Sequence, residues 1–560
     1  MKAIHVSELP DPDLEVAYIL GETDQRPQPR MMGGAHEAAD RFSRELATWN
    51  PPIRAADADI LPDKSISDAR AQDMTRNDAF VGAGSSLHKD NIVGSMFLLN
   101  AKPVLAVLGL DETWATEFQE EVEAKFTLYA ESLDNWIDAS RRNTLTSMVR
   151  LAIGTYLAGG EMLATAEWMR GDRPYQTAVQ MVELHRLSDP GDQPFDFQRV
   201  RGGIRFSAMG EPLGYYIRRA SPGLAFQFQD AYSWSYIRAR NSIGRPQVLH
   251  IMEQQRPGQS RGISQLVGAL KEMRITKRFR DITLQNAVVN ASFAAAIESE
   301  LPTAAVFESL GGGDVGSNVV NYATQFLGAI QQFAGNARNM SIDGVRIPHL
   351  MPGTKLNMLP MGHPGGIGSE FEASLLRYIA ANLDVSYEEL SKDYAKANYS
   401  SARAGMLGTW KAMQSRKRTV ADRFASTVYR LWFEEAVNLG DLETMKTAKA
   451  PNIYDRLMMD AYTGCEWIGA ARGQIDELKE TQASILRLKN GLGTYEEELG
   501  KQGRDWRTVF AQVKREKELM KKLGIEPQEA NAINAASGTP SEAGDGSSGE
   551  PSDGEKDAAA

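Results

Sequence analysis

The most constraining feature of this sequence is a run of 36 residues, 263–298, that contains no proline and a single glycine, Gly268. We predict one helix from Ile263 to about Glu298. Apolar side chains recur along it at helical spacing, although the stretch 277–280 interrupts them: Leu266, Leu270, Met273, Leu284 and Val288. A helix of this length is about three times the usual one. Such a helix is expected to span a structure or to lie against copies of itself.

A second amphipathic helix is predicted in "SEFEASLLRYIAANL", residues 369–383. Five apolar side chains share one of its faces: Phe371, Leu375, Leu376, Ile379 and Leu383. Helices are also expected at 66–92 and 111–138, and further helices after 383 continue to about 525. Strand patterns occur in 175–189, 203–220 and 244–254, and a proline-bounded strand lies between the two main helices. The fold class is therefore α+β and mainly helical.

The net charge of −11 is unevenly distributed. Residues 526–560 hold eight acidic side chains and one lysine, a charge of −7, which leaves −4 for residues 1–525. This acidic tail is predicted to be disordered, because it has too few apolar residues to bury. The remaining chain lacks the strong positive charge of a protein that grips nucleic acid by its phosphates.

Cys465 is the single cysteine, which excludes an internal disulfide and cysteine-based zinc sites and favours a reducing compartment. No window approaches the roughly 18 apolar residues of a membrane span, and the N-terminus lacks the apolar core of a signal peptide. The seven histidines are scattered without metal-ligand spacing. We therefore expect an intracellular, soluble protein with no metal and no cofactor.

One motif is typical of an enzyme. "GQSRG", residues 258–262, satisfies the G-x-S-x-G pattern of a serine hydrolase and lies between a strand and a helix. Ser260 would be the nucleophile, with His349 or His363 following in the chain order of that class. The polar "EQQRP" before the motif opposes this reading, since an elbow needs its buried strand to run into the turn. A polar turn with a helix-capping serine explains the same residues. No P-loop sequence is present, so no ATPase activity is expected.

Two basic clusters remain. In "KEMRITKRFR", Lys271, Arg274 and Arg278 share one helical face with Lys277 beside them. The second cluster is "SRKRTVADR", which contains four basic residues: Arg416, Lys417, Arg418 and Arg423. Ion pairing between subunits or within one helix is one explanation, and contact with a phosphate backbone is the other. Because no base-reading module is present, any contact with DNA is expected to be independent of its sequence.

Several segments occur in a characteristic order: "WNPP", "ADADILP", "RPGQSRG", "RIPHLMPGTKLN", "LLRYIAANLDVSYEELSKDYAKANYSSARA" and "CEWIGAARGQIDELKE". Together they resemble the lambda-family portal proteins of tailed bacteriophages, over roughly residues 49–520. No single motif is diagnostic, but the ordered series is specific. The resemblance implies a structural protein rather than an enzyme. A different ring or adaptor protein of the virion and the Ser260 hydrolase are the alternatives.

The resemblance implies a cone-shaped ring of about twelve subunits at one capsid vertex, with a central channel. Double-stranded DNA is packaged and ejected through such a channel. The implied partners are the terminase large subunit, a head-completion or tail connector protein, and the major capsid and scaffold proteins. The implied location is the virion, and the host cytoplasm during assembly. The implied parts are an N-terminal arm (1–50), wing (51–261), first stem helix (262–298), clip (299–367), second stem helix (368–384), tunnel loop with wing helices (385–450), crown (451–525) and the disordered tail.

The segment "KANYSSARAGMLGTW", 396–410, corresponds by this resemblance to the tunnel loop and the helix behind it. Asn398, Ser400 or Ser401 is expected to cap that helix. The residues expected to line or brace the DNA channel are Tyr394, Lys396, Asn398, Tyr399, Ser400 and Arg403, the last pairing with a neighbouring subunit. The stem is expected to present Lys271, Arg274, Lys277 and Arg278.

Overall fold

The computed structural model describes residues 46, 48–191, 199–221, 228–294, 340–342, 345–347, 367–395, 398–446, 450–473 and 477–524. The chain divides into two compact units, residues 1–59 and 60–560. In the first unit the described part is short, with a turn in which the Trp49 amide donates to the Leu46 carbonyl at 2.9 Å. Everything below concerns the second unit, together with helix α2, which begins at Ala56.

The N-terminal helices are α2 (Ala56–Asn77) and α3 (Ala79–Ile92). They replace the single helix predicted over 66–92. The break occurs at Asp78, whose extended backbone and side chain, accepting from the amides of Phe80 and Val81, begin a new helix. α5 (Glu112–Ala130) ends eight residues before the predicted limit of 138. α4 (Leu105–Leu108) and α6 (Leu145–Gly159) complete this part of the chain.

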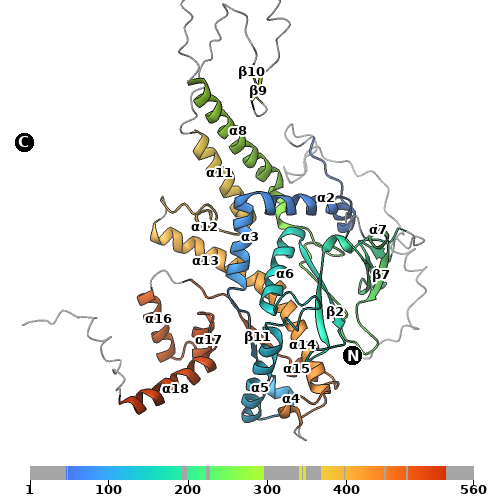
Figure 1. Ribbon diagram of the computed structural model, residues 1–560, viewed down its shortest axis with the longest axis vertical. Helices are drawn as coiled ribbons and strands as arrows, with labels where there is room; N and C mark the ends of the chain where they lie inside the picture. The colour runs from blue at the N-terminus through green and yellow to red at the C-terminus, as the bar shows by residue number, and fades with distance from the viewer. Residues whose placement is uncertain are drawn as a thin grey trace, which may run out of the picture. The chain divides into compact units, whose positions relative to one another are not determined.

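Three antiparallel sheets accompany these helices (Figure 1). The first has β2 (Glu161–Trp168) between β3 (Thr177–Val182) and β8 (Val248–Met252). The second has the order β4 (Val200–Arg201), β5 (Ile204–Phe206), β6 (Pro212–Arg218), β7 (Trp234–Arg238). The third pairs β1 (Leu98–Ala101) with β11 (Cys465–Ile468), far away in sequence. All three predicted strand segments are confirmed, whereas β1, β2, β4, β7 and β11 were not predicted.

The described helices and sheets contribute to two hydrophobic cores. The larger one is rich in aromatic side chains from α5 and α14 (Arg423–Asn438), among them Phe118, Phe126, Trp432 and Phe433. The smaller core joins the first two sheets, with Leu163 and Val248 from one and Ile204, Tyr215 and Ile217 from the other. Burial of each such side chain contributes about 1.5–3 kcal/mol. Residues of α5, α6, α14 and the first sheet thus contribute much of the buried apolar surface.

The long predicted helix begins later than expected. Ser264 caps a short 3-10 turn, η5 (Gln265–Ala269), and the α-helix α8 runs from Leu270 to Ala294. Residues 295–298 of the prediction lie outside the described residues. The second predicted helix is confirmed as α11 (Ile367–Asn382). Between them, β9 (Met340–Ile342) and β10 (Val345–Ile347) form an antiparallel pair.

The C-terminal part begins with α12 (Tyr387–Ser391) and α13 (Tyr399–Arg416), which continues through a π-helical segment (Lys417–Asp422) into α14. α15 (Met458–Tyr462) precedes β11. The last helices are α16 (Glu477–Lys489), α17 (Tyr495–Gly500) and α18 (Trp506–Leu523). Glu498 of α17 is held by Arg487 at 2.8 Å and Lys501 at 2.7 Å. These hydrogen bonds lower the pKa of Glu498 to about 2. Outside this C-terminal part, the short helix α7 (Phe228–Ala231) forms a single turn just before β7.

Candidate functional site

The two long helices α8 and α11 pack as an antiparallel pair (Figure 1). The Phe279 and Phe371 rings meet edge to face with centroids 5.6 Å apart. At the other end, the Asn382 side-chain amide donates to the Gln265 carbonyl at 2.9 Å. Later residues of the first helical segment thus contact earlier residues of the second, as in an antiparallel pair. The C-terminal end of α8 and the N-terminal end of α11 therefore point toward the same end of the pair.

Arg280 ties this pair to the base of the structure. Its guanidinium lies 3.2 Å from Glu372 of α11 and 3.5 Å from Asp78, the residue that caps α3. It also stacks over the Phe80 ring at 4.7 Å. Neighbouring Lys277 donates to the Asn77 carbonyl at 2.8 Å. The part of the predicted basic stretch that faces α3 is therefore structural, since it joins both long helices to the α2–α3 junction.

The other three basic residues of α8 face outward. Lys271, Arg274 and Arg278 are all exposed, and none of them makes an ion pair or hydrogen bond with any residue that the structure describes. Ile275 and Ile282 lie beside them, each 45% exposed. Lys271 and Arg274 also line a groove of about 960 Å³ between α8 and α2, opposite Asp63 and Asp73 of α2. This surface combines basic side chains with apolar ones, as interfaces between subunits often do.

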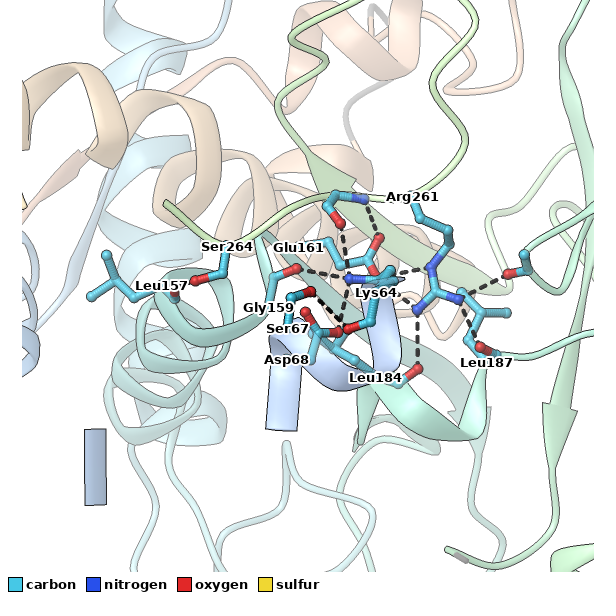
Figure 2. A network of polar contacts seen from close by, with 12 residues as sticks. Lys64, Ser67, Asp68, Leu157, Gly159, Glu161, Leu184, Leu187, Arg261 and Ser264 are labelled. Atoms are coloured by element: carbon cyan, nitrogen blue, oxygen red, sulfur yellow. Dashed lines mark hydrogen bonds and ion pairs between the residues drawn. The ribbon is translucent and has the colours of Figure 1, made fainter. Parts of the chain in front are cut away.

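A buried ion cluster fixes the point where the chain enters η5 and α8 (Figure 2). At its centre is Glu161 at the start of β2, whose side chain is fully buried. The guanidinium of Arg261 lies 2.7 Å from Glu161, and the ammonium of Lys64 from α2 lies 3.2 Å away. His250 of β8 at 2.9 Å and the Gly262 amide at 2.7 Å also donate to this carboxylate. Four separate segments are thus joined through one side chain.

The cations of this cluster have further partners. Arg261 donates to the carbonyls of Leu184, Leu187 and Gly202, at 3.1, 2.7 and 2.9 Å. Lys64 donates to the carbonyls of Gly159 and Gly262 and lies 2.9 Å from Asp68. Burial alone would raise the pKa of Glu161, but Arg261, Lys64 and His250 hold it well below its usual value. At Asp68 burial dominates over Lys64, and its pKa is raised.

The hydrolase reading of "GQSRG" does not fit this geometry. Ser260 is 1% exposed, and the strand before it, β8, ends at Met252. A nucleophile elbow needs a serine exposed at the tip of a turn that directly follows a buried strand. His349 and His363 lie outside the described residues. The motif has a different role, because Gln259 donates to the Arg261 carbonyl at 2.9 Å and Arg261 belongs to the ion cluster.

The segment predicted to form a channel loop is only partly described. Asn398 caps α13 in a capping box: its side chain accepts from the Ser401 amide at 2.8 Å, and the Ser401 hydroxyl accepts from the Asn398 amide at 3.1 Å. This confirms that the serines begin a helix, with Asn398 as the capping residue. Ser400 is exposed in the first turn, and Tyr394 precedes the loop with 47% of its surface exposed. Lys396 and the side chain of Tyr399 lie outside the described residues.

Arg403 was expected to pair with a neighbouring subunit. In the single chain its guanidinium lies 3.8 Å from Glu480 of α16. The same two residues line a small pocket between α13 and α16. Arg403 is therefore already oriented by an acidic side chain of its own chain.

Two residues of the second basic cluster, Arg416 and Lys417, have partners within the chain. Arg416 donates to Nδ1 of His88 at 2.6 Å and lies 3.1 Å from Asp384, which follows α11. His88 is completely buried, and its Nε2 lies 2.9 Å from the Leu383 carbonyl. Burial, assisted by the positive charge of Arg416, lowers the pKa of His88 to about 3. Lys417 pairs with Asp422 at 2.7 Å. The Lys417–Asp422 pair lies within one helical segment, as one of the two explanations of this cluster expected, whereas Arg416 pairs with Asp384 from another part of the chain.

Sequence reasoning missed the two polar centres that organise the site. Glu161 and Arg261 are a hundred residues apart, and His88 and Arg416 are more than three hundred apart. The available signal was a glutamate and a histidine inside otherwise apolar patterns. Within the described residues no group of three or more acidic, histidine or cysteine side chains could hold a metal ion. No described helix is long and apolar enough to cross a membrane.

Comparison with known proteins shows which class of protein this chain resembles. Curated relatives that are similar to this chain are portal proteins of bacteriophages, and the likeness runs along nearly its whole length. The sequence profile described as "Phage portal protein, lambda family" matches residues 42–417, and the chain belongs to this family.

Two relatives are 34% identical to this chain. The portal protein of Escherichia phage N15 aligns over 92% of this chain and 95% of its own length. Portal protein B of Escherichia phage lambda aligns over 89% and 92%, respectively. A probable portal protein of Halomonas phage phiHAP-1 is 21% identical over 88% of both chains.

Solved structures that are similar to this chain come from gene transfer agent particles. The neck of the empty particle, with C6 symmetry, covers 83% of this chain and 98% of its own at 13% identity, with a TM-score of 0.32. The neck of the native particle, with C12 symmetry, covers 78% and 97% at 12% identity, with a TM-score of 0.30.

Proposed function

We propose that this chain forms a cone-shaped ring of about twelve subunits at one capsid vertex, through which double-stranded DNA is packaged and later ejected. The observation that carries the proposal is membership of the lambda portal family, supported by portal relatives aligned over about nine-tenths of the chain. Each subunit contributes to the wall of a central channel. The protein is a component of the virion, assembled in the host cytoplasm.

The parts of the subunit follow from the same proposal. α8 and α11 are the two stem helices (262–298 and 368–384), and the clip is the insertion 299–367 at one end of their antiparallel pair. The wing is residues 51–261, the tunnel loop and wing helices are 385–450, and the crown is 451–525. β11 of the proposed crown is paired with β1 of the proposed wing, so these two parts share a sheet.

The stem suits passage of DNA because it is only moderately basic. Lys271, Arg274 and Arg278 are exposed on α8, and the body of the chain carries a net charge of −4 over residues 1–525. Each phosphate that is neutralised releases counterions and adds affinity, so a strongly basic wall would hold DNA in place. Ile275 and Ile282 on the same face favour packing of neighbouring stems, which buries apolar surface that one copy leaves exposed.

The chain itself has no catalytic role in this proposal. It carries no P-loop sequence, and ATP hydrolysis belongs to the terminase large subunit that docks on the clip. After packaging, a head-completion or tail connector protein takes the same place. The major capsid and scaffold proteins surround the ring during assembly.

Negative-stain microscopy of the purified chain tests the assembly. We expect rings with a central hole at micromolar concentration and moderate salt, and monomers alone under these conditions would contradict the proposal. The tunnel loop has its own test. Lys396→Glu should impair packaging while rings still assemble, because the proposed loop residues (Tyr394, Lys396, Asn398, Tyr399, Ser400 and Arg403) line or brace the DNA path. Unchanged phage titres with this variant would remove Lys396 from that path.

A further inference from the structure

The last described helix, α18, carries several basic side chains on one side. Val509, Val513, Met520 and Leu523 recur at the spacing of one helical face, and Lys514, Lys517 and Lys521 recur on another. The helix holds six basic and two acidic side chains, a net charge of +4. A helix with this charge stands out in a chain whose total is −11.

The basic side chains of α18 beyond its first turn lack partners within the described structure. Arg507 pairs with Glu123 at 2.9 Å, but Lys514, Lys517 and Lys521 are not paired with any residue that the structure describes. Glu518, four residues from Lys514, forms no ion pair there either. The negative end of the helix dipole accounts for cations in the last turn only. The cations of the middle turns therefore need another explanation.

The segment that follows has the opposite charge. Residues 526–560 carry eight acidic side chains and one lysine, a charge of −7, immediately after a helix of +4. Gly524 ends α18 in the left-handed conformation, with φ of 70°, which allows the chain to turn away from the helix axis. Glu542 follows Gly524 by 18 residues, a distance that the chain can span up to about 60 Å. The helix itself is only about 27 Å long, so the acidic residues can reach every turn of it.

We propose that the acidic segment 526–560 binds the basic face of α18 in the same chain and blocks other polyanions, nucleic acid in particular, from that face. Because the segment is tethered to the helix, its effective concentration there is on the order of millimolar, and weak charge contacts suffice for occupancy. The contact is electrostatic and exposed, so it weakens as salt is added. It does not depend on the portal role, since it requires only the charges of one chain.

Binding of DNA by truncated protein tests this inference. The full chain is compared with a variant that ends at Gly524, using a fluorescent 30-base-pair duplex of random sequence in fluorescence anisotropy. We expect the truncated chain to bind about tenfold more tightly at low salt, with the difference lost near 0.5 M salt. A full-length variant with its eight acidic tail residues changed to Asn or Gln should match the truncated chain. Equal affinity of the full and truncated chains overturns the proposal.

The matched surface variant is Lys514→Glu/Lys517→Glu/Lys521→Glu in the truncated chain. It should lose the gained affinity, because the gain depends on these exposed charges, and retention of the gain overturns the assignment to α18. Carbodiimide cross-linking supplies the direct readout. Cross-links between α18 lysines and tail carboxylates are expected within one chain in mixtures of isotopically labelled and unlabelled protein. Cross-links that occur only between labelled and unlabelled chains show that a second copy is the occupant and overturn the intramolecular proposal.

Discussion

Replacement of Glu161 by Gln tests whether the buried ion cluster holds the root of α8. All the described partners of this carboxylate are hydrogen-bond donors or cations. They are Arg261, Lys64, His250 and the Gly262 amide. A glutamine of the same shape keeps one acceptor and places an NH₂ group against donors. It also leaves two buried cations without their central anion.

The expected cost is large. Removal of one partner from a buried ion pair typically destabilises a protein by about 3–5 kcal/mol. The remaining carbonyl contacts of Arg261 and Lys64 keep Glu161→Gln at the lower end of that range. If the unit that unfolds contains about 200 residues, the melting temperature falls by roughly 10 °C. Hydrogen exchange should quicken most at the start of β2 and in η5, where the carboxylate joins the segments.

Glu167→Gln is the matched control, because it lies on the same strand and its carboxylate accepts a single described hydrogen bond, from Thr165 at 2.6 Å. Its cost should stay below about 1 kcal/mol. The double variant Glu161→Gln/Arg261→Gln should cost less than the sum of its single changes by about 1–3 kcal/mol, since it also removes one uncompensated cation. Thermal and denaturant unfolding measure the unsubstituted chain, the single variants Glu161→Gln, Glu167→Gln and Arg261→Gln, and the double variant. The reasoning fails if Glu161→Gln is as mild as Glu167→Gln, or if the double variant is additive.

The folded pKa of His88 lies near 3, below the usual 6.5, so the native state binds fewer protons than the unfolded chain, and stability falls as pH drops below about 6.5. The loss at pH 5 is about 2 kcal/mol, and His88→Gln should flatten it in denaturant titrations between pH 7 and 5. Reversal of the charges of Lys271, Arg274 and Arg278 to Glu should reduce DNA content per particle while circular dichroism of the chain is unaltered. Normal DNA content in the mutant particles refutes a role for this face in packaging. Asn398→Ala should cost about 1 kcal/mol and speed hydrogen exchange in the first turn of α13, whereas Asn398→Asp should not.

Local features were readable from the sequence. The Asn398 cap depends on residues three positions apart, and the strands β3, β6 and β8 lie in short runs of apolar, β-branched and aromatic residues bounded by Gly, Pro and Asp. The start of α8 was misplaced because Ser264 caps a turn whose first residues, Gln265–Ala269, have the same apolar spacing as an α-helix. Residue type alone does not distinguish a 3-10 turn from the α-helix that follows it.

Long-range features were not readable. β1 pairs with β11 across more than three hundred and sixty residues, and neither strand has a strong alternating pattern. The partners of Glu161 come from segments on both sides of it in the chain, and their charges have meaning only once burial removes water. The "GQSRG" motif illustrates the difference. Its residue spacing matches the motif of serine hydrolases, and its burial shows that it is a structural junction.

The crossing of Gly160 and Gly262 has a consequence for how this sequence tolerates mutation. A Cβ on Gly160, whose φ is 73°, would lie 2.1 Å from the Ile263 backbone, and a Cβ on Gly262 would lie 2.2 Å from the Gly160 carbonyl. Surface loops usually accept substitutions and insertions. In a saturation library selected for viable phage, these two positions should stay glycine, although Gly262 follows the polar, loop-like segment 253–261. Heat-sensitive lesions are expected to concentrate at their neighbours, where a substitution can be accommodated at a cost.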